Sequence, residues 1–196
     1  YLDGEEVLTD FFGAFCGEMA EVELPLFECF HMDSLRVNGE WVEPVEIYVI
    51  DTVRMDYMVE AFISDDIFSV ESFVQDHGTI SPTDTMVFCT SDVPVTIIPN
   101  DCYHIDSVFI DGVYTGAISS YLFSNINGNH TISATFARDS YTVTAMTGAG
   151  GSISPNGISE VPCGDNWSCT ITPDEGYYID YLTVDGEQQP AQNSWS

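Results

Sequence analysis

Residues 88–112 read FCTSDVPVTIIPNDCYHIDSVFIDG, and two other stretches of the chain closely resemble this segment. Residues 15–39 read FCGEMAEVELPLFECFHMDSLRVNG, and residues 162–186 read PCGDNWSCTITPDEGYYIDYLTVDG. A shift of 73 residues places the first copy on the second, and after one inserted residue a shift of 74 places the second on the third. Self-similarity at a fixed period indicates structural units that are strung or stacked along the chain.

The pattern within each copy is that of short β-strands. Apolar residues alternate with small polar residues in four segments of the third copy: 141–146, 151–154, 168–172 and 181–184. Tight hairpin turns, whose positive φ angles favour Gly after Asn or Asp, are predicted at three equivalent dipeptides: Asn38-Gly39, Asp111-Gly112 and Asp185-Gly186. No helical period competes with this pattern, so the sequence predicts an all-β fold.

We expect three tandem, sandwich-like β modules of about 73 residues. Residues 1–66 form a degenerate first repeat without its opening strand, and residues 67–139 form a complete repeat. Residues 140–196 form a third repeat that stops before its closing strands. Such interrupted modules leave open strand edges, which another part of the polypeptide or another subunit must cover.

The six cysteines also follow the repeat. Cys16 and Cys29 have the same spacing as Cys89 and Cys102, while in the third unit Gly176 replaces the second cysteine and Cys169 appears close to Cys163. The simplest interpretation is one local disulfide per unit, pairing Cys16 with Cys29, Cys89 with Cys102 and Cys163 with Cys169. Six cysteines allow about 15 pairings, so the sequence does not choose among them. Disulfides indicate an oxidising compartment outside the cytoplasm.

Metal ligation is the alternative use of these residues. The chain contains no C-x-x-C, and its four histidines do not lie at zinc-finger spacing from the cysteines. His31 and His104 occupy equivalent positions, and Tyr178 replaces them in the third unit. This exchange favours a packed, half-buried ring over a ligand.

Acidic residues dominate the charge of the chain. Asp and Glu number 32 against three arginines and no lysine, which gives a formal net charge of −29. Binding to nucleic acid or to anionic lipid depends on Lys and Arg, so neither is an expected partner. No apolar run is long enough for a membrane helix, and no signal peptide is recognisable at the acidic start of the sequence.

Three equivalent aspartates, Asp33, Asp106 and Asp180, raise the question of calcium. Carboxylates at loop ends bind Ca²⁺, but no D-x-D-x-D-G loop is present. We favour solvated or turn-capping carboxylates and expect no cofactor. Two sequons, at Asn129 and Asn166, are glycosylation candidates and agree with an exported chain.

Several motifs resemble a known repeat family. The segment YTVTAMTGAGGSISPNG (141–157) and the segment TITPDEGYYIDYLTVDG (170–186) are similar to the divergent internalin-B-type B-repeat, or bacterial repeat domain. YLFSNINGNHTISATF (121–136) resembles the end of that repeat, and LPLFECFHMDSLRVNG (24–39) resembles a degenerate copy. The resemblance implies small all-β modules strung along extracellular proteins of bacteria and archaea as stalks, spacers or adhesive surfaces.

The sequence does not favour an enzyme, because it holds no H-E-x-x-H, no G-x-S-x-G and no recognisable Cys–His pair. We expect a non-catalytic structural protein at the cell surface, part of a filament, sheath or stalk. Its partners would be copies of itself or neighbouring repeats, joined in one arrangement by β-strand addition. The alternative is an adhesive module that binds glycans or proteins, with Trp41, Trp167 and Trp195 as candidates for stacking on sugars.

Overall fold

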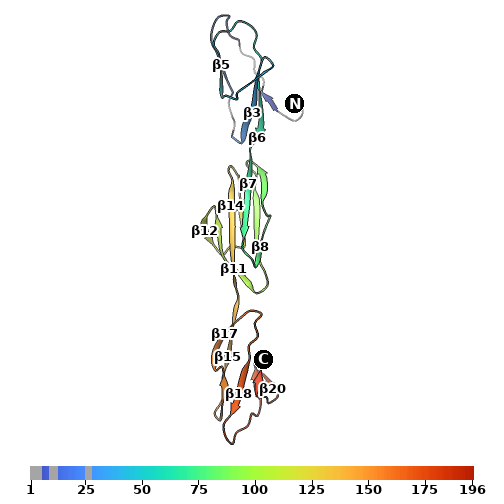
Figure 1. The fold of residues 1–196 in the computed structure, drawn as a ribbon, viewed down its shortest axis with the longest axis vertical. Coiled ribbons are helices and arrows are strands. Elements are labelled where there is room, and N and C mark those ends of the chain that lie inside the picture. The colour runs from blue at the N-terminus through green and yellow to red at the C-terminus, as the bar shows by residue number, and fades with distance from the viewer. Residues whose placement is uncertain (1–5, 9–12, 25–27) are drawn as a thin grey trace.

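The computed structural model describes residues 6–8, 13–24 and 28–196, and three groups of β-strands follow one another along a rod (Figure 1). We name these groups module one (1–66), module two (67–139) and module three (140–196). Among the described residues there is no helix, so none could cross a membrane. The chain is an all-β protein made of tandem repeats.

Module two contains eight strands in two sheets. The strands are β7 (Ile67–Val74), β8 (Gly78–Ser81), β9 (Thr85–Phe88), β10 (Val93–Pro99), β11 (Tyr103–Ile110), β12 (Val113–Gly116), β13 (Ser120–Phe123) and β14 (His130–Arg138). The larger sheet has the order β12-β11-β14-β7-β9, and the smaller has the order β13-β10-β8. All neighbours are antiparallel except β7 and β14, which run parallel from Val70 opposite His130 to Val74 opposite Ala134.

A sandwich core lies between these two sheets. Val93, Val95 and Ile97 alternate inward along β10 from the smaller sheet. The larger sheet contributes Val108 and Ile110 from β11 and a set of residues from β7 and β14: Val70, Ile132 and Ala134. The strict two-residue alternation arises because successive side chains of a strand point to opposite faces.

Module one repeats this arrangement with fewer residues. Its strands are β1 (Glu6–Leu8), β2 (Ala20–Glu23), β3 (Phe30–Val37), β4 (Glu40–Val42), β5 (Ile47–Ile50) and β6 (Val59–Asp65). The sheets have the orders β1-β6-β3-β4 and β2-β5. Their core holds Val22, Leu35, Val37, Ile50 and Ala61. β1 pairs with β6 in the antiparallel sense. It covers the edge of β6 that corresponds to the edge of β14 with which β7 pairs in the parallel sense.

Module three has shorter sheets than module two. Its strands are β15 (Ser140–Ala145), β16 (Gly151–Ser154), β17 (Gly157–Pro162), β18 (Cys169–Pro173), β19 (Leu182–Val184), β20 (Glu187–Gln189) and β21 (Ser194–Trp195). They form three small sheets: β15-β17, β16-β18-β21 and β19-β20. Four of these strands, β15, β16, β18 and β19, confirm the predicted segments, while β17, β20 and β21 had no prediction.

The predicted hairpin turns are confirmed at all three positions. Both turn residues have positive φ in every case: 51° and 84° at Asn38-Gly39, 50° and 77° at Asp111-Gly112, and 48° and 84° at Asp185-Gly186. The flanking residues pair directly, as Ile110 does with Val113. Two consecutive left-handed residues match the twist of the hairpin, which explains the Asx-Gly choice.

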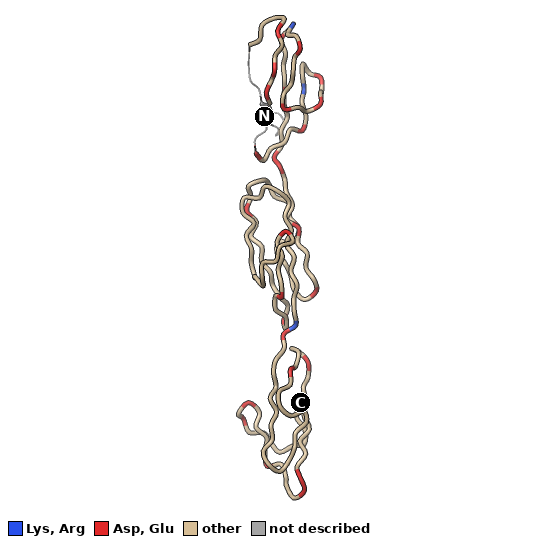
Figure 2. Tube along the Cα trace, turned by 90° about the vertical axis from the view of Figure 1, so that its left-hand side faces the viewer, with Lys and Arg blue, Asp and Glu red and all other residues tan. Residues whose placement is uncertain are grey.

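Acidic residues are spread along the trace of all three modules (Figure 2). Of the three arginines, Arg36 and Arg54 belong to module one and Arg138 lies where module two meets module three. Repulsion between such charges is distributed along the rod, and salt screens it over about 10 Å.

Candidate functional site: two clamped junctions between modules

Each pair of neighbouring modules is joined through a single aspartate. β6 ends at Asp65 and β7 begins at Ile67, so only Asp66 separates the closing strand of module one from the opening strand of module two. Asp139 has the same place between β14 and β15. So short a connection leaves little freedom for one module to swing relative to the next.

A disulfide crosses each of these junctions. Cys29, directly before β3 of module one, is bonded to Cys89, directly after β9 of module two, with 5.3 Å between their Cα atoms. Cys102, before β11, is bonded in the same way to Cys163 of module three, with 5.4 Å between Cα atoms. We call each disulfide with its aspartate a clamp.

The backbone of the joining aspartate is hydrogen-bonded to both cysteines of its clamp. The Asp66 N–H donates to the carbonyl of Cys29 at 2.8 Å, and the Cys89 N–H donates to the carbonyl of Asp66 at 2.9 Å. The second clamp repeats both bonds at 2.8 Å through Asp139. The aspartate is therefore held between two cysteines that are themselves bonded to each other.

A histidine holds the aspartate side chain in each clamp. His31 Nδ1 lies 2.8 Å from Asp66 Oδ1, and His104 Nδ1 lies 2.6 Å from Asp139 Oδ1. The hydrogen bond with Asp66 raises the pKa of His31 above its ordinary value against an opposing effect of desolvation, and the negative charge of Asp33 adds to the rise. Each histidine thus ties a strand of one module to the residue that leads into the next.

The expectation of a packed, half-buried ring at these histidines misses their carboxylate partners. The side chains of His31 and His104 are 53% and 56% exposed, and each is oriented by a carboxylate. Tyr178, the residue at this position in module three, is 81% exposed. The clamp explains why Tyr178 can replace the histidine. Module three has Gly176 in place of the donor cysteine, so no clamp forms at this position and no histidine is needed to bind an aspartate.

Cys29 and Cys102 have a backbone conformation that is uncommon for residues with a side chain. Their φ angles are 73° and 67°, in the left-handed region. The disulfide and the carbonyl hydrogen bond from aspartate both depend on this turn of the chain. The equivalent position in module three holds Gly176, which has φ 83° and no sulfur.

The predicted local pairs Cys16–Cys29, Cys89–Cys102 and Cys163–Cys169 are wrong. β10 runs between Cys89 and Cys102, and its seven residues span roughly 23 Å, whereas bridged Cα atoms lie within about 7 Å of each other. Cys89 and Cys102 therefore lie at opposite ends of module two. Each is bonded to a cysteine of a neighbouring module instead.

Two cysteines are left without a disulfide. Cys16 is exposed, and Cys169 is buried on β18 with 6% of its surface accessible. Cys16 aligns with Cys89 and Cys163 in the repeat, whereas Cys169 has no equivalent in the other modules. The length of the strand between Cys89 and Cys102 was the signal that could have excluded their local pairing.

Arg138 adds a contact to the second clamp alone. Its Nη2 atom donates to the carbonyl of Cys163 at 2.5 Å and lies 2.8 Å from Oδ1 of Asp165. Asp65 stands at the equivalent position of the first clamp. The second junction therefore has an ion pair that crosses it in addition to its disulfide.

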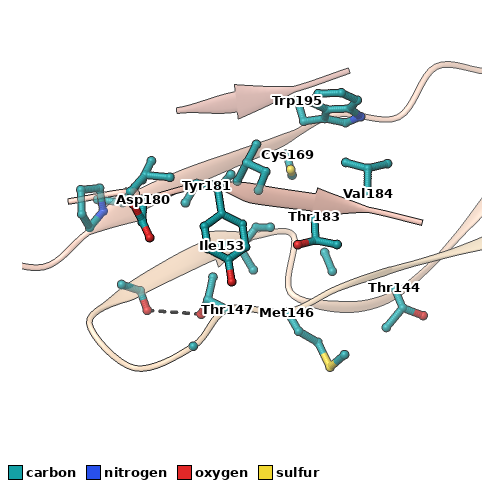
Figure 3. Close-up of a pocket in the computed structure, with 18 of the residues that line it drawn as sticks. Thr144, Met146, Thr147, Ile153, Cys169, Asp180, Tyr181, Thr183, Val184 and Trp195 are labelled. Carbon is teal, nitrogen blue, oxygen red and sulfur yellow. Dashed lines mark hydrogen bonds between the residues drawn. The ribbon is translucent and has the colours of Figure 1, made fainter. Parts of the chain in front are cut away.

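A cavity of about 1010 Å³ lies in module three. Ile153, Cys169, Tyr181 and Trp195 point into it from β16, β18, the segment before β19, and β21 (Figure 3). In module two β14 lies beside β7 and completes the core, whereas among the described residues β15 pairs with β17 alone.

The equivalent aspartates Asp33 and Asp106 lie at β-bulges and not in turns. The register of β3 on β6 shifts between Met32 and Ser34, and that of β11 on β14 shifts at the same place. Asp33 accepts a hydrogen bond from the Ser64 hydroxyl. Asp180 lines the cavity of module three. Over the described ranges no group of three or more His, Cys, Asp or Glu side chains is placed to hold a metal ion.

The remaining candidates differ in exposure. Trp41 on β4 is 63% exposed, whereas Trp167 and Trp195 are half-buried in the lining of the cavity. Asn129 and Asn166 lie in loops with exposed side chains, and Asn129 Oδ1 accepts a hydrogen bond from the Ser69 N–H. Glycosylation at both asparagines stays a prediction.

Comparison with protein families matches the divergent InlB B-repeat domain twice in tandem, at residues 68–140 and 141–195. Searches of curated proteins and of solved structures gave no significant match. The two matched segments cover more than half of the chain, and each coincides with a β module described above. The chain therefore belongs to the divergent InlB B-repeat family.

Proposed function

We propose that this chain is a load-bearing spacer, a segment of a stalk, sheath or filament outside the cytoplasm. The observation that carries the proposal is the placement of the two disulfides between neighbouring modules. A disulfide within a module stabilises that module alone, whereas a disulfide across a junction also holds the modules in line. Extracellular location is supported by the disulfides themselves and by the repeat family.

Tension along the rod would pass through the clamps. From Cys29 the force crosses to Cys89, follows residues 90–101 along β10, and crosses again from Cys102 to Cys163. Residues 30–88 and 103–162 lie inside covalent loops and cannot be drawn out. β10 is the central strand of the smaller sheet, with β8 and β13 on either side, so the strand under load is the best supported one.

Each loop also restricts the unfolded chain. The cysteines of the two clamps are 60 and 61 residues apart in sequence. In the chain-entropy model, closing a loop of this length removes unfolded-state freedom that corresponds to about 4 kcal/mol. The clamps therefore resist thermal unfolding as well as extension.

Single-molecule pulling from the two ends tests the proposal. Each residue that is released on unfolding lengthens the extended chain by about 3.5 Å. Without reductant, we expect residues 30–88 and 103–162 to add nothing to the length gained. With reductant, both segments should lengthen. A variant with Cys29→Ser and Cys89→Ser should release only the first segment. Equal extension of the oxidised and reduced chains would contradict the load-bearing role.

An adhesive function is the second candidate, and a repeated exposed aromatic residue favours it. Trp41 packs at a tilt of 48° against Phe62 with 5.3 Å between ring centroids, and the Arg36 guanidinium lies 5.4 Å from the Trp41 ring centroid. Tyr114, its equivalent on β12 of module two, is 61% exposed and contacts Phe109. Flat, exposed rings of this kind stack on sugars. Loss of a glycan-array signal in Trp41→Ala, with folding retained, would support this role.

Strand addition remains part of the proposed function for module three. The free edge of β15 and the adjoining cavity are suited to a strand that runs parallel to β15, as β14 runs beside β7. A synthetic peptide of residues 130–138, the β14 sequence, is the probe. Saturable binding that protects the β15 amides from hydrogen exchange would support it, and unchanged exchange would contradict it.

A further inference from the structure

Cys16 is an exposed thiol in a turn that has the same hydrogen bonds as the turn of Cys89. In each turn the residue after the cysteine donates its N–H to a distant loop carbonyl: Gly17 to Val53 at 2.8 Å and Thr90 to Ile126 at 2.7 Å. The residue after each cysteine also has positive φ, 90° at Gly17 and 65° at Thr90. The turn that receives a disulfide in module two is thus already formed in module one.

The equivalent cysteine is bonded to the preceding module in both of the other modules. Cys89 of module two is bonded to Cys29, and Cys163 of module three is bonded to Cys102. In both cases the partner is the cysteine directly before a strand of the preceding module, β3 for Cys89 and β11 for Cys163. Cys16 is the one member of the set without its bond.

We propose that Cys16 is the second cysteine of a third clamp, and that its partner is the first cysteine of a B-repeat module placed N-terminal to module one. This inference rests on the clamp geometry and extends the spacer function proposed above. With the third clamp formed, tension would enter the rod at Cys16 and pass along residues 17–28, as it passes along residues 90–101 in module two.

The two known clamps define the chemistry of the partner. The donor strand begins with Cys, an aromatic residue, His, an apolar residue and Asp, as in residues 29–33 and 102–106. The cysteine has positive φ, and the histidine binds the aspartate that leads into the next module. A module with this strand start carries the donor cysteine and the histidine of the clamp, and an aspartate after its last strand, as at Asp66 and Asp139, completes the clamp.

A second copy of the chain, joined through its module three, does not fit as the partner. Gly176 occupies the position of the donor cysteine there, and Tyr178 replaces the histidine. Cys29 and Cys102 are already bonded, and Cys169 is buried. The remaining exposed thiol of a second copy is Cys16 itself, and a Cys16–Cys16 bond would lack the aspartate and histidine of a clamp.

Formation of the bond is an ordinary thiol–disulfide exchange. The partner thiolate attacks an oxidised thiol-disulfide oxidoreductase or glutathione disulfide, and the Cys16 thiolate then displaces that group from the mixed disulfide. Two thiols lose two electrons and two protons, one S–S bond forms, and the oxidant is reduced to two thiols. The exposure of Cys16 suits this exchange.

An extended chain provides the test. Residues 67–146 are placed directly before Tyr1, because Met146 precedes the position that aligns with residue 1 and the repeat register is kept. The Cys89 of the added segment is changed to Ser. After oxidation with glutathione disulfide, we expect a peptide that links the added Cys102 to Cys16 in a non-reducing digest, and at least a tenfold loss of Cys16 labelling by maleimide.

The control carries Cys102→Ser in the added segment and should keep Cys16 reactive. If the shorter segment folds poorly, a longer added segment, residues 1–146, retains its own Cys29–Cys89 clamp. The same linked peptide and the same loss of Cys16 labelling are then measured with it. A Cys16 that stays reactive beside a protease-resistant added segment, or that forms a Cys16–Cys16 dimer, would overturn the inference. Pulling of the unextended chain tests the spacer function separately.

Discussion

Nδ1 of His31 lies 2.8 Å from Oδ1 of Asp66, so a side chain of β3 is bound to the residue that joins module one to module two. His31 Nε2 lies 3.1 Å from Asp33 Oδ1, which places the ring between two carboxylates. Protonation gives the imidazole a charge that attracts both. We therefore expect the first junction to be sensitive to pH as His31 titrates.

The first prediction concerns the direction of this pH effect. The pKa of His31 is raised, mainly by its hydrogen bond with Asp66, so the stabilisation is fully present below the unfolded pKa of about 6.5. It is lost as the pH rises through the folded pKa. We expect the difference in melting temperature between the chain and its His31→Gln variant to shrink over that range.

An NMR titration of the His31 ring provides the direct measurement. The titration midpoint should lie above 6.5 in the native chain and should fall in Asp66→Asn, which keeps both backbone hydrogen bonds of the clamp. A midpoint at or below 6.5, or one unchanged in Asp66→Asn, would contradict the assigned contact.

The second prediction concerns Gly78, the first residue of β8. A Cβ atom at this position would lie 2.2 Å from Cζ of Phe136, so alanine forces the ring out of its place against the core. We expect Gly78→Ala to lower the free energy of unfolding of module two by about 1–3 kcal/mol. Urea unfolding of the full chain, followed by hydrogen exchange of the β8 and β10 amides, measures it.

A double-mutant cycle identifies the cause. In a Phe136→Ala background the added methyl meets no ring, so Gly78→Ala should cost much less there. Gly128→Ala is the control, because no atom lies within 4 Å of its added Cβ. An equal cost of Gly78→Ala in both backgrounds would show that Phe136 is not responsible.

The third prediction concerns the core of module one. Leu35 is 0% exposed between its two sheets, so Leu35→Ala removes packed methyl groups and should destabilise the module by about 2–5 kcal/mol. Leu122→Ala on β13 is the matched control, since Leu122 is 53% exposed and should cost less than about 1 kcal/mol. Similar losses at both positions would argue against the described core.

The fourth prediction counts thiols. Maleimide should label Cys16 rapidly in the native chain, whereas Cys169 should react only after denaturation because it is 6% exposed. In Cys16→Ser the fast phase should disappear and the slow one remain. A native chain with no reactive thiol before or after denaturation would instead fit three disulfides, one in each unit.

Most of the fold could be predicted from the sequence because local chemistry determines it. Asp111-Gly112 permits two positive φ angles in succession, and this alone selects the tight hairpin between β11 and β12. Alternation along residues 93–99 indicates which side chains of β10 face the core. Periodicity of this kind needs no knowledge of partners that are distant in the sequence.

The clamps could not be predicted in the same way, because they depend on which module meets which. The repeat gives Cys29 and Cys102 equivalent positions, and both a local bond and a bond to the next module preserve that equivalence. The length of β10 decides between them, since a straight strand separates Cys89 from Cys102. The contact of His31 with Asp66 was missed for the same reason.

Disulfide mapping tests the central claim most directly. The full chain is alkylated and digested without reduction, and the linked peptides are identified by mass spectrometry. The account predicts two linked pairs, Cys29 with Cys89 and Cys102 with Cys163, together with alkylated Cys16. Peptides that link Cys16 to Cys29 or Cys89 to Cys102 would contradict it, because each bond would then lie within a single module.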